Sequence, residues 1–274
     1  MSQPTRNPIA GEETADVQWK GLCRLGGVTA LVASALFFSD IVVLVAGVPI
    51  PGSASDLFAL MQGNKVAGIL ELFFTDLVGL ALLIPFIFGL YAVLRRANAG
   101  YAALATVVAV VGIGIVFATN SNYSLIYLSD QYAAARTEIQ RSQILAAGES
   151  LFATSMWGTG FLMAGLLIEG AMVVFSVLIL RSGIFSKWIA YLGILGHGLD
   201  FLHTIVLLVL IPAVSPALAS AVGGPLLAVG GSLQLIWYPL AAFRILQLGR
   251  VEGKSLGQGV TGILRGDRAE NAAH

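Results

Sequence analysis

Charged residues are scarce in this chain of 274 residues: they make up 11% of it, whereas 57% is hydrophobic. A soluble domain carries about 25% charged residues, so water cannot be the solvent for most of this surface. The formal net charge is zero, which removes the overall attraction to nucleic acid that a basic protein has. We therefore expect an integral membrane protein whose main partner is the lipid bilayer.

Cysteine is almost absent, since the chain contains Cys23 and no other. An intramolecular disulfide and a multi-cysteine metal site are therefore excluded. The segment before Lys20 lacks the short basic start and the cleavage site of a removable signal peptide, so we expect the first hydrophobic helix to be retained. A phosphate-binding glycine loop, a nucleophile elbow and a Walker motif are also missing, which gives no positive sign of an enzyme.

Long apolar stretches, in contrast, are plentiful, and six of them reach the roughly 20 residues that a membrane span needs. Helices are the expected structure, because in hydrocarbon each backbone group must be satisfied within its own segment. The predicted fold is therefore an all-α bundle of six transmembrane helices. The spans are expected at about 25–48, 66–94, 101–123, 155–180, 188–211 and 222–246.

The basic residues predict how these spans are oriented, because Lys and Arg accumulate on the cytoplasmic side of a membrane. Three of them, Lys65, Arg136 and Arg141, fall on one side of the predicted bundle. The other side carries twelve: Arg6, Lys20, Arg24, Arg95, Arg96, Arg181, Lys187, Arg244, Arg250, Lys254, Arg265 and Arg268. We expect both termini in the cytoplasm, with tight inner turns at 95–100 and 181–187. The transmembrane domain then covers 20–248, between polar tails at 1–19 and 249–274, the second expected to be disordered.

On the outer side, the connection 49–65 is expected to be short and rich in turns. The longer connection 124–154 is predicted to extend the third helix and to add a short surface helix. Small residues recur at every fourth position on two spans, as Gly26, Ala30 and Ser34 and as Gly224, Ala228 and Ser232. Such stripes let helix backbones approach closely, although chance in a chain rich in Ala and Gly explains them equally well.

Acidic side chains lie inside several predicted spans, and Asp40, Asp76, Glu169 and Asp200 are the deepest of them. A charged side chain at a bilayer centre costs at least about 2.5 kcal/mol. These carboxyl groups are therefore expected either to be neutral and hydrogen-bonded or to face a cavity with water, protons or a cation. At about 1.5 Å per residue from the inner basic anchors, they lie between the midplane and the outer leaflet, with Asn120 nearby. This predicts a polar chamber in the outer half of the bundle.

The pattern His197-Gly-Leu-Asp200-Phe-Leu-His203 places three possible metal ligands on one helical stripe, because neighbours three residues apart share a face. Histidine and carboxylate are good zinc ligands, and zinc would permit hydrolysis by an activated water. The spacing differs from that of HExxH, whose histidines are four residues apart. A hydrogen-bonded helix contact without a metal is the simpler explanation of the same residues.

These observations leave three hypotheses about function. The first is a non-enzymatic membrane protein that handles protons, a cation or a small ligand through Asp40, Asp76, Asp200, Glu169 and Asn120. The second is an intramembrane metal hydrolase that uses His197, Asp200 and His203. In the third, the protein is a structural or accessory subunit, and its acids are neutral contacts between helices.

Several segments of the chain resemble a bacterial membrane family known as domain of unknown function 4386. The resemblance lies in Arg24–Ala30 at the entry to the first span, in Asp76, in the turn Arg181–Lys187 and in Asp200, and it covers about 22–248. The chain departs from the pattern at Ser186, where proline is expected, and at His197 and His203, which do not belong to it. The resemblance implies a bacterial inner-membrane protein of about six helices, and it implies no reaction.

Overall fold

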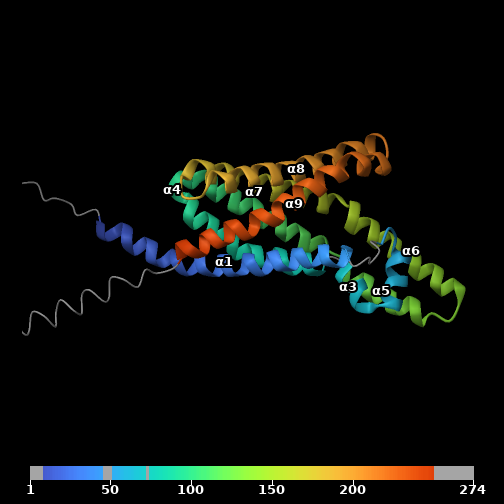
Figure 1. Cartoon of the computed structure of the whole chain (residues 1–274). Coiled ribbons are helices and arrows are strands. Elements are labelled where there is room, and N and C mark those ends of the chain that lie inside the picture. Colours follow the sequence, from blue (N-terminus) through green and yellow to red (C-terminus); the bar gives the residue numbers. More distant parts are fainter. Residues whose placement is uncertain (1–8, 46–50, 72–73, 250–274) are drawn as a thin grey trace, which may run out of the picture.

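The computed structural model describes residues 9–45, 51–71 and 74–249, and the regular structure in these ranges is entirely helical (Figure 1). This confirms the all-α prediction. In chain order the helices are α1 (Ile9–Val45), α2 (Ala54–Gly63), α3 (Lys65–Glu71), α4 (Phe74–Thr119), α5 (Asn122–Ala134), α6 (Glu138–Trp157), α7 (Thr159–Ser182), α8 (Lys187–Ala213) and α9 (Pro216–Gly249).

Five stretches of the described chain are long and apolar enough to cross a membrane. They are Trp19–Ser39, Leu77–Ala134, Glu138–Ser182, Lys187–Ile211 and Ala217–Gly249. The second is 58 residues long and contains a break at Asn98, whose φ of −163° and ψ of 105° are not helical. The carboxamide of Asn98 accepts a hydrogen bond from the Tyr101 backbone N–H at 3.1 Å and so caps the helix that follows. This break lies within the segment 95–100, where the basic residues predict a turn.

The long helices lie side by side (Figure 1). Their main contacts join α1 to α4 and α9, α9 to α8, α8 to α7, and α7 to α4. Phe86, Phe175 and Trp237 are fully buried between them, whereas apolar side chains such as Val107 and Leu195 are exposed. An apolar outer surface around a core that also contains polar groups is what a lipid environment favours.

Glycines allow the closest helix contacts, although one predicted stripe is misplaced. A Cβ atom at Gly26 would come within 2.6 Å of the Pro85 carbonyl oxygen, and Ala30 and Ser34 are buried along the same helix. On α9, however, Gly224 has open space around it, and Ser232 is exposed. The close approach to α8 occurs instead at Gly230, where a Cβ atom would come within 2.9 Å of the Gly196 carbonyl oxygen. Of the two explanations, close helix contact therefore fits the stripe of the first helix, and chance fits the stripe of the last.

The helices α2, α3, α5 and α6, which we call the cap, lie beyond one end of the long helices (Figure 1). They have a small core of their own, formed by buried side chains that include Leu57, Phe58 and Leu125. The Lys65 ammonium group pairs with the Asp130 carboxylate at 2.8 Å and joins α3 to α5. The sequence predicted turns at 49–65, whereas the structure has α2 in this segment. For 124–154 it predicted an extension of the third helix and a short surface helix. The structure has α5 directly after the end of α4, followed by α6.

Candidate functional site

Two of the predicted site residues, Glu169 on α7 and Asp200 on α8, are linked through a side chain of α9. The Gln234 amide nitrogen donates to Glu169 Oε2 and to Asp200 Oδ2, each at 3.1 Å. The same nitrogen lies 3.5 Å from the Gly196 carbonyl oxygen. One carboxamide therefore connects two carboxyl groups that belong to different helices.

His197 completes this group, which we call the polar cluster: Glu169, His197, Asp200 and Gln234. Its Nδ1 lies 2.7 Å from Glu169 Oε2, and its side chain is fully buried. Its ring packs edge-to-face against Trp237 and Tyr238, with centroid separations of 4.7 and 5.5 Å. The imidazole therefore faces a carboxyl group through Nδ1 and packs against two aromatic rings.

The geometry of the cluster follows from close packing between α8 and α9. Gly196 directly precedes His197, and a Cβ atom there would come within 3.3 Å of the Gln234 backbone nitrogen. Together with Gly230, this glycine lets the two backbones approach closely enough for Gln234 to reach across to α7. Measured from Arg181, Lys187 and Arg244, the cluster lies about 15–20 Å into the bundle, near the middle of a core about 30 Å thick.

The remaining predicted residues lie apart from this cluster or outside the described part. Asn120 accepts a hydrogen bond from the Asn122 backbone N–H at 3.0 Å, in the short link between α4 and α5. His203 Nδ1 lies 3.0 Å from the Gly223 carbonyl oxygen, at another point of the contact between α8 and α9. The side chains of Asp40 and Asp76 lie outside the described residues, so their predicted role stays a prediction.

The three residues of the zinc hypothesis have different partners. His197 faces Glu169, Asp200 accepts from Gln234, and His203 faces a backbone carbonyl group. Across the described residues, no group of three His, Cys, Asp or Glu side chains could hold a metal ion. The metal hydrolase therefore has no support from the geometry of these residues.

A family model described as domain of unknown function (DUF4386) matches residues 25–238. The chain belongs to this family. No curated protein and no solved structure matches the chain. The DUF4386 region contains the whole polar cluster and ends at Tyr238, one of the aromatic residues that pack on His197. The family brings no assigned reaction, so the chemistry must be argued from the cluster itself.

Gln234 is the member of the polar cluster that the sequence patterns did not single out, although it lies within the DUF4386 domain. Ionisable side chains are conspicuous in apolar stretches, whereas a lone carboxamide carries no charge. Its position was nevertheless a usable signal, because Gln234 lies within the sixth predicted span and ten residues before Arg244. A buried amide in a membrane helix needs a hydrogen-bond partner, as a carboxyl group does.

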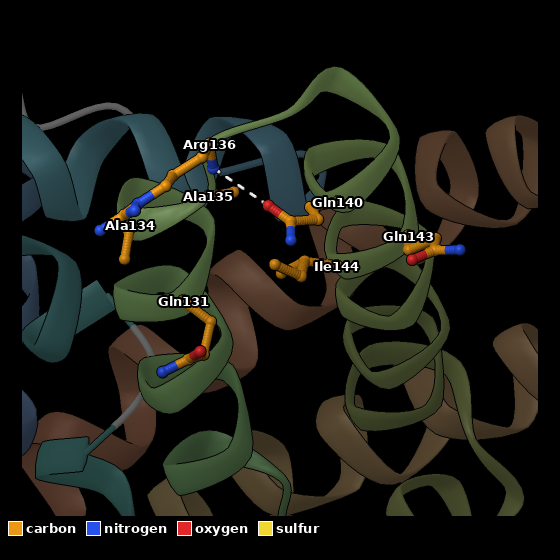
Figure 2. Close-up of a pocket in the computed structure, with 7 residues that line it drawn as sticks. All are labelled: Gln131, Ala134, Ala135, Arg136, Gln140, Gln143 and Ile144. Carbon is orange, nitrogen blue, oxygen red and sulfur yellow. Dashed lines mark hydrogen bonds between the residues drawn. The ribbon is translucent and has the colours of Figure 1, made fainter.

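A separate pocket of about 310 Å³ lies at the tip of the cap, between α5 and α6 (Figure 2). Gln131 on α5 and Gln140 and Ile144 on α6 face the space between the two helices, and the Arg136 backbone N–H donates to Gln140 Oε1 at 3.1 Å. The pocket contains none of the predicted site residues. It is an open polar notch, whereas binding pockets are typically enclosed and mostly apolar.

Proposed function

We propose that this chain is a multi-pass membrane protein that binds and releases a proton at the polar cluster, without being an enzyme. The membrane character rests on its long apolar helices and on its DUF4386 domain. The proposal of proton binding is based on the arrangement of Glu169, His197, Asp200 and Gln234. The proposed setting is a bacterial inner membrane, with the cap outside and both termini in the cytoplasm.

The observation that carries the proposal is the position of the Gln234 amide nitrogen between two carboxyl groups. A hydrogen-bond donor occupies the place between the two oxygens where a bridging cation would lie. Since each oxygen lies 3.1 Å from this nitrogen, the two are at most about 6 Å apart, close enough for their charges to interact strongly. Two ionised carboxylates so deep in a membrane are costly, and a proton relieves this cost without requiring further space.

His197 gives that proton a second place to reside. With Nδ1 at 2.7 Å from Glu169 Oε2, the ring and the carboxyl group can share one proton across a short hydrogen bond. Among the described residues, the side chains that hydrogen-bond to the two carboxyl groups are His197 and Gln234, and neither is Lys or Arg. No fixed positive charge among these partners offsets the carboxylates, so gaining or losing a proton changes the net charge of the cluster.

We also propose six crossings for the whole chain. The stretch Leu77–Ala134 is far longer than the roughly 20 residues of one span, and the break at Asn98 falls between two basic residues and Tyr101. Each part of α4 then crosses once, and the basic residues of every inner connection lie on the same side. This arrangement is supported by the distribution of Lys and Arg.

Infrared difference spectra of the purified protein at two pH values test the proposal, because a protonated carboxyl group has its own C=O stretching band. We expect a band that changes with pH in the wild type and is lost or shifted in Asp200→Asn and Glu169→Gln. Asp130→Asn is the control, since Asp130 is an exposed carboxylate of the cap. The proposal fails if the band is unchanged in both cluster variants while they remain folded, as a purely structural role would predict. A stoichiometric transition metal in elemental analysis would favour the metal hydrolase instead.

A further inference from the structure

The polar cluster is closed on the side that leads to the basic end of the bundle. One to two turns from the cluster in that direction lie Ser176 on α7 and Trp237 on α9, both fully buried. Beyond them, Ile179, Ala241 and Ile245 are also fully buried and apolar. Ser176 donates to the Met172 carbonyl oxygen of its own helix, so its hydroxyl hydrogen is already engaged. Closely packed, mostly apolar side chains therefore form a barrier to a proton on this side.

The side of the cluster that leads to the cap has a different composition. His203 lies one turn from Asp200 on α8, is only partly buried, and packs on α9 as Asp200 does. Residues three apart on a helix have Cβ atoms about 5–6 Å from each other. Since His203 Nδ1 lies 3.0 Å from the Gly223 carbonyl oxygen, this nitrogen carries the hydrogen, and Nε2 of the neutral ring is left with a lone pair.

We propose that protons reach the polar cluster from the cap end alone, with His203 as the relay and the layer around Trp237 as the seal. This inference rests on the proposed proton binding and adds its direction. The protein then responds to the pH outside the cell without conducting protons across the membrane.

The proton step balances at each transfer. Nε2 of His203 takes a proton from external water, which leaves hydroxide to the bulk and makes the ring an imidazolium. The ring then gives that proton to the Asp200 carboxylate and returns to its starting tautomer, with Nδ1–H still on Gly223. The net change is one proton gained by the cluster and one lost by the external solution.

Among the described residues, five titratable groups face this proton or its neighbours. Glu169 comes from α7, His197, Asp200 and His203 come from α8, and Tyr238 comes from α9, beside the uncharged Gln234. From α4, the described neighbour of the aromatic group is Phe86, which does not titrate. Trp237 is the natural reporter of the cluster's charge, because indole fluorescence responds to nearby charge and the Trp237 ring centroid lies 4.7 Å from that of His197, a member of the cluster.

The test uses the full chain in lipid vesicles, with Trp19, Trp157 and Trp188 replaced by Phe so that Trp237 alone emits. The same protein carries Ser142→Cys in the cap, and a thiol reagent that cannot cross the membrane labels this position only where the cap faces outward. The labelled share of the protein gives the cap-outward fraction. The external pH is then changed rapidly, and a protonophore is added afterwards. We expect the share of the total fluorescence change that is fast to equal the cap-outward fraction of the protein. The rest of the fluorescence change should occur only after the protonophore is added.

If the fast share of the fluorescence change instead equals the cap-inward fraction, or if the whole change is fast, proton access from the cap end alone is wrong. Proton binding at the cluster would still stand. A cluster that gives no change even with the protonophore contradicts the proposed function itself. His203→Gln should slow the fast phase about 100-fold, the lower end of what a positioned proton-transfer group contributes, with the same final amplitude. Ser232→Ala, on the exposed face of α9, is the control and should keep the wild-type rate. An unchanged rate in folded His203→Gln would remove His203 from the path.

Discussion

Gln234 carries no charge, yet both carboxyl groups of the cluster depend on it. Its amide donates to Glu169 and Asp200 at 3.1 Å, from a helix that contributes no acid of its own to the cluster. Removing a donor that two acceptors share has a larger effect than its own net bond strength suggests. Asp200 would lose its amide donor, and Glu169 would keep only its contact with His197.

Gln234→Leu keeps most of the side-chain volume and removes this donor. We expect it to lower the free energy of unfolding by about 1–3 kcal/mol, the cost of leaving buried polar atoms unsatisfied. Denaturation of the purified protein in detergent measures the change. Gln247→Leu is the control on the same helix, since Gln247 only accepts from Arg244 at its exposed end. Equal stability of the two variants would show that the amide does not hold the cluster together.

At the residue scale, the sequence predicted the members of the cluster better than its geometry. Glu169, His197 and Asp200 could be singled out because ionisable groups in apolar stretches are costly and therefore conspicuous. Their pairing could not be predicted, because it depends on how far α7 and α9 are rotated, and no spacing within one helix encodes that angle. The metal hypothesis placed His197 and His203 in one site, and the simpler explanation paired one histidine with Asp200. In the structure His197 faces Glu169 on α7, and His203 faces a backbone carbonyl group on α9.

At the element scale, the contact between α8 and α9 controls the distances in the cluster. The two backbones approach each other closely at Gly196 and Gly230, and Gly230 lies one turn from Gln234. The sequence could predict that small residues mediate helix contacts, since backbones approach only where side chains are absent. It placed the stripe of α9 on the face of Gly224 rather than that of Gly230, because the face that a helix turns inward follows from the packing of its neighbours.

Two adjacent glycines of α9 provide a matched test of this contact. A Cβ atom at Gly230 would lie 2.9 Å from the Gly196 carbonyl oxygen and 3.2 Å from the Asp200 backbone nitrogen, whereas a Cβ atom at Gly231 has open space. Gly230→Ala should separate α8 from α9 and cost about 1–3 kcal/mol, as overpacking does. Gly231→Ala should be neutral or slightly stabilising, because alanine favours the helix. Thermal unfolding in detergent compares them, and equal melting temperatures would contradict the close approach.

At the scale of the whole molecule, the long helices were predictable and the cap was not. A span requires about 20 apolar residues, which the sequence displays directly. The cap is built from shorter, mixed segments whose core depends on contacts between distant parts of the chain, such as Phe58 on α2 packing against Tyr132 on α5. The pairing of Lys65 with Asp130, 65 residues apart, is likewise invisible to periodicity.

The number of crossings decides on which side each end of the molecule lies. An odd number places the termini on opposite sides, and an even number places them together. Cysteine labelling distinguishes the two after Cys23, which is buried, has been replaced by Ser. In intact cells, Ser142→Cys in the cap should react with an impermeant maleimide, whereas Ala99→Cys, beside the break at Asn98, should react only after the membrane is opened. If Ala99→Cys is labelled in intact cells, or stays unlabelled after the membrane is opened, Leu77–Ala134 does not cross as the proposed pair of spans. The cap end would then no longer be defined as external, and the direction of proton access would have to be assigned anew.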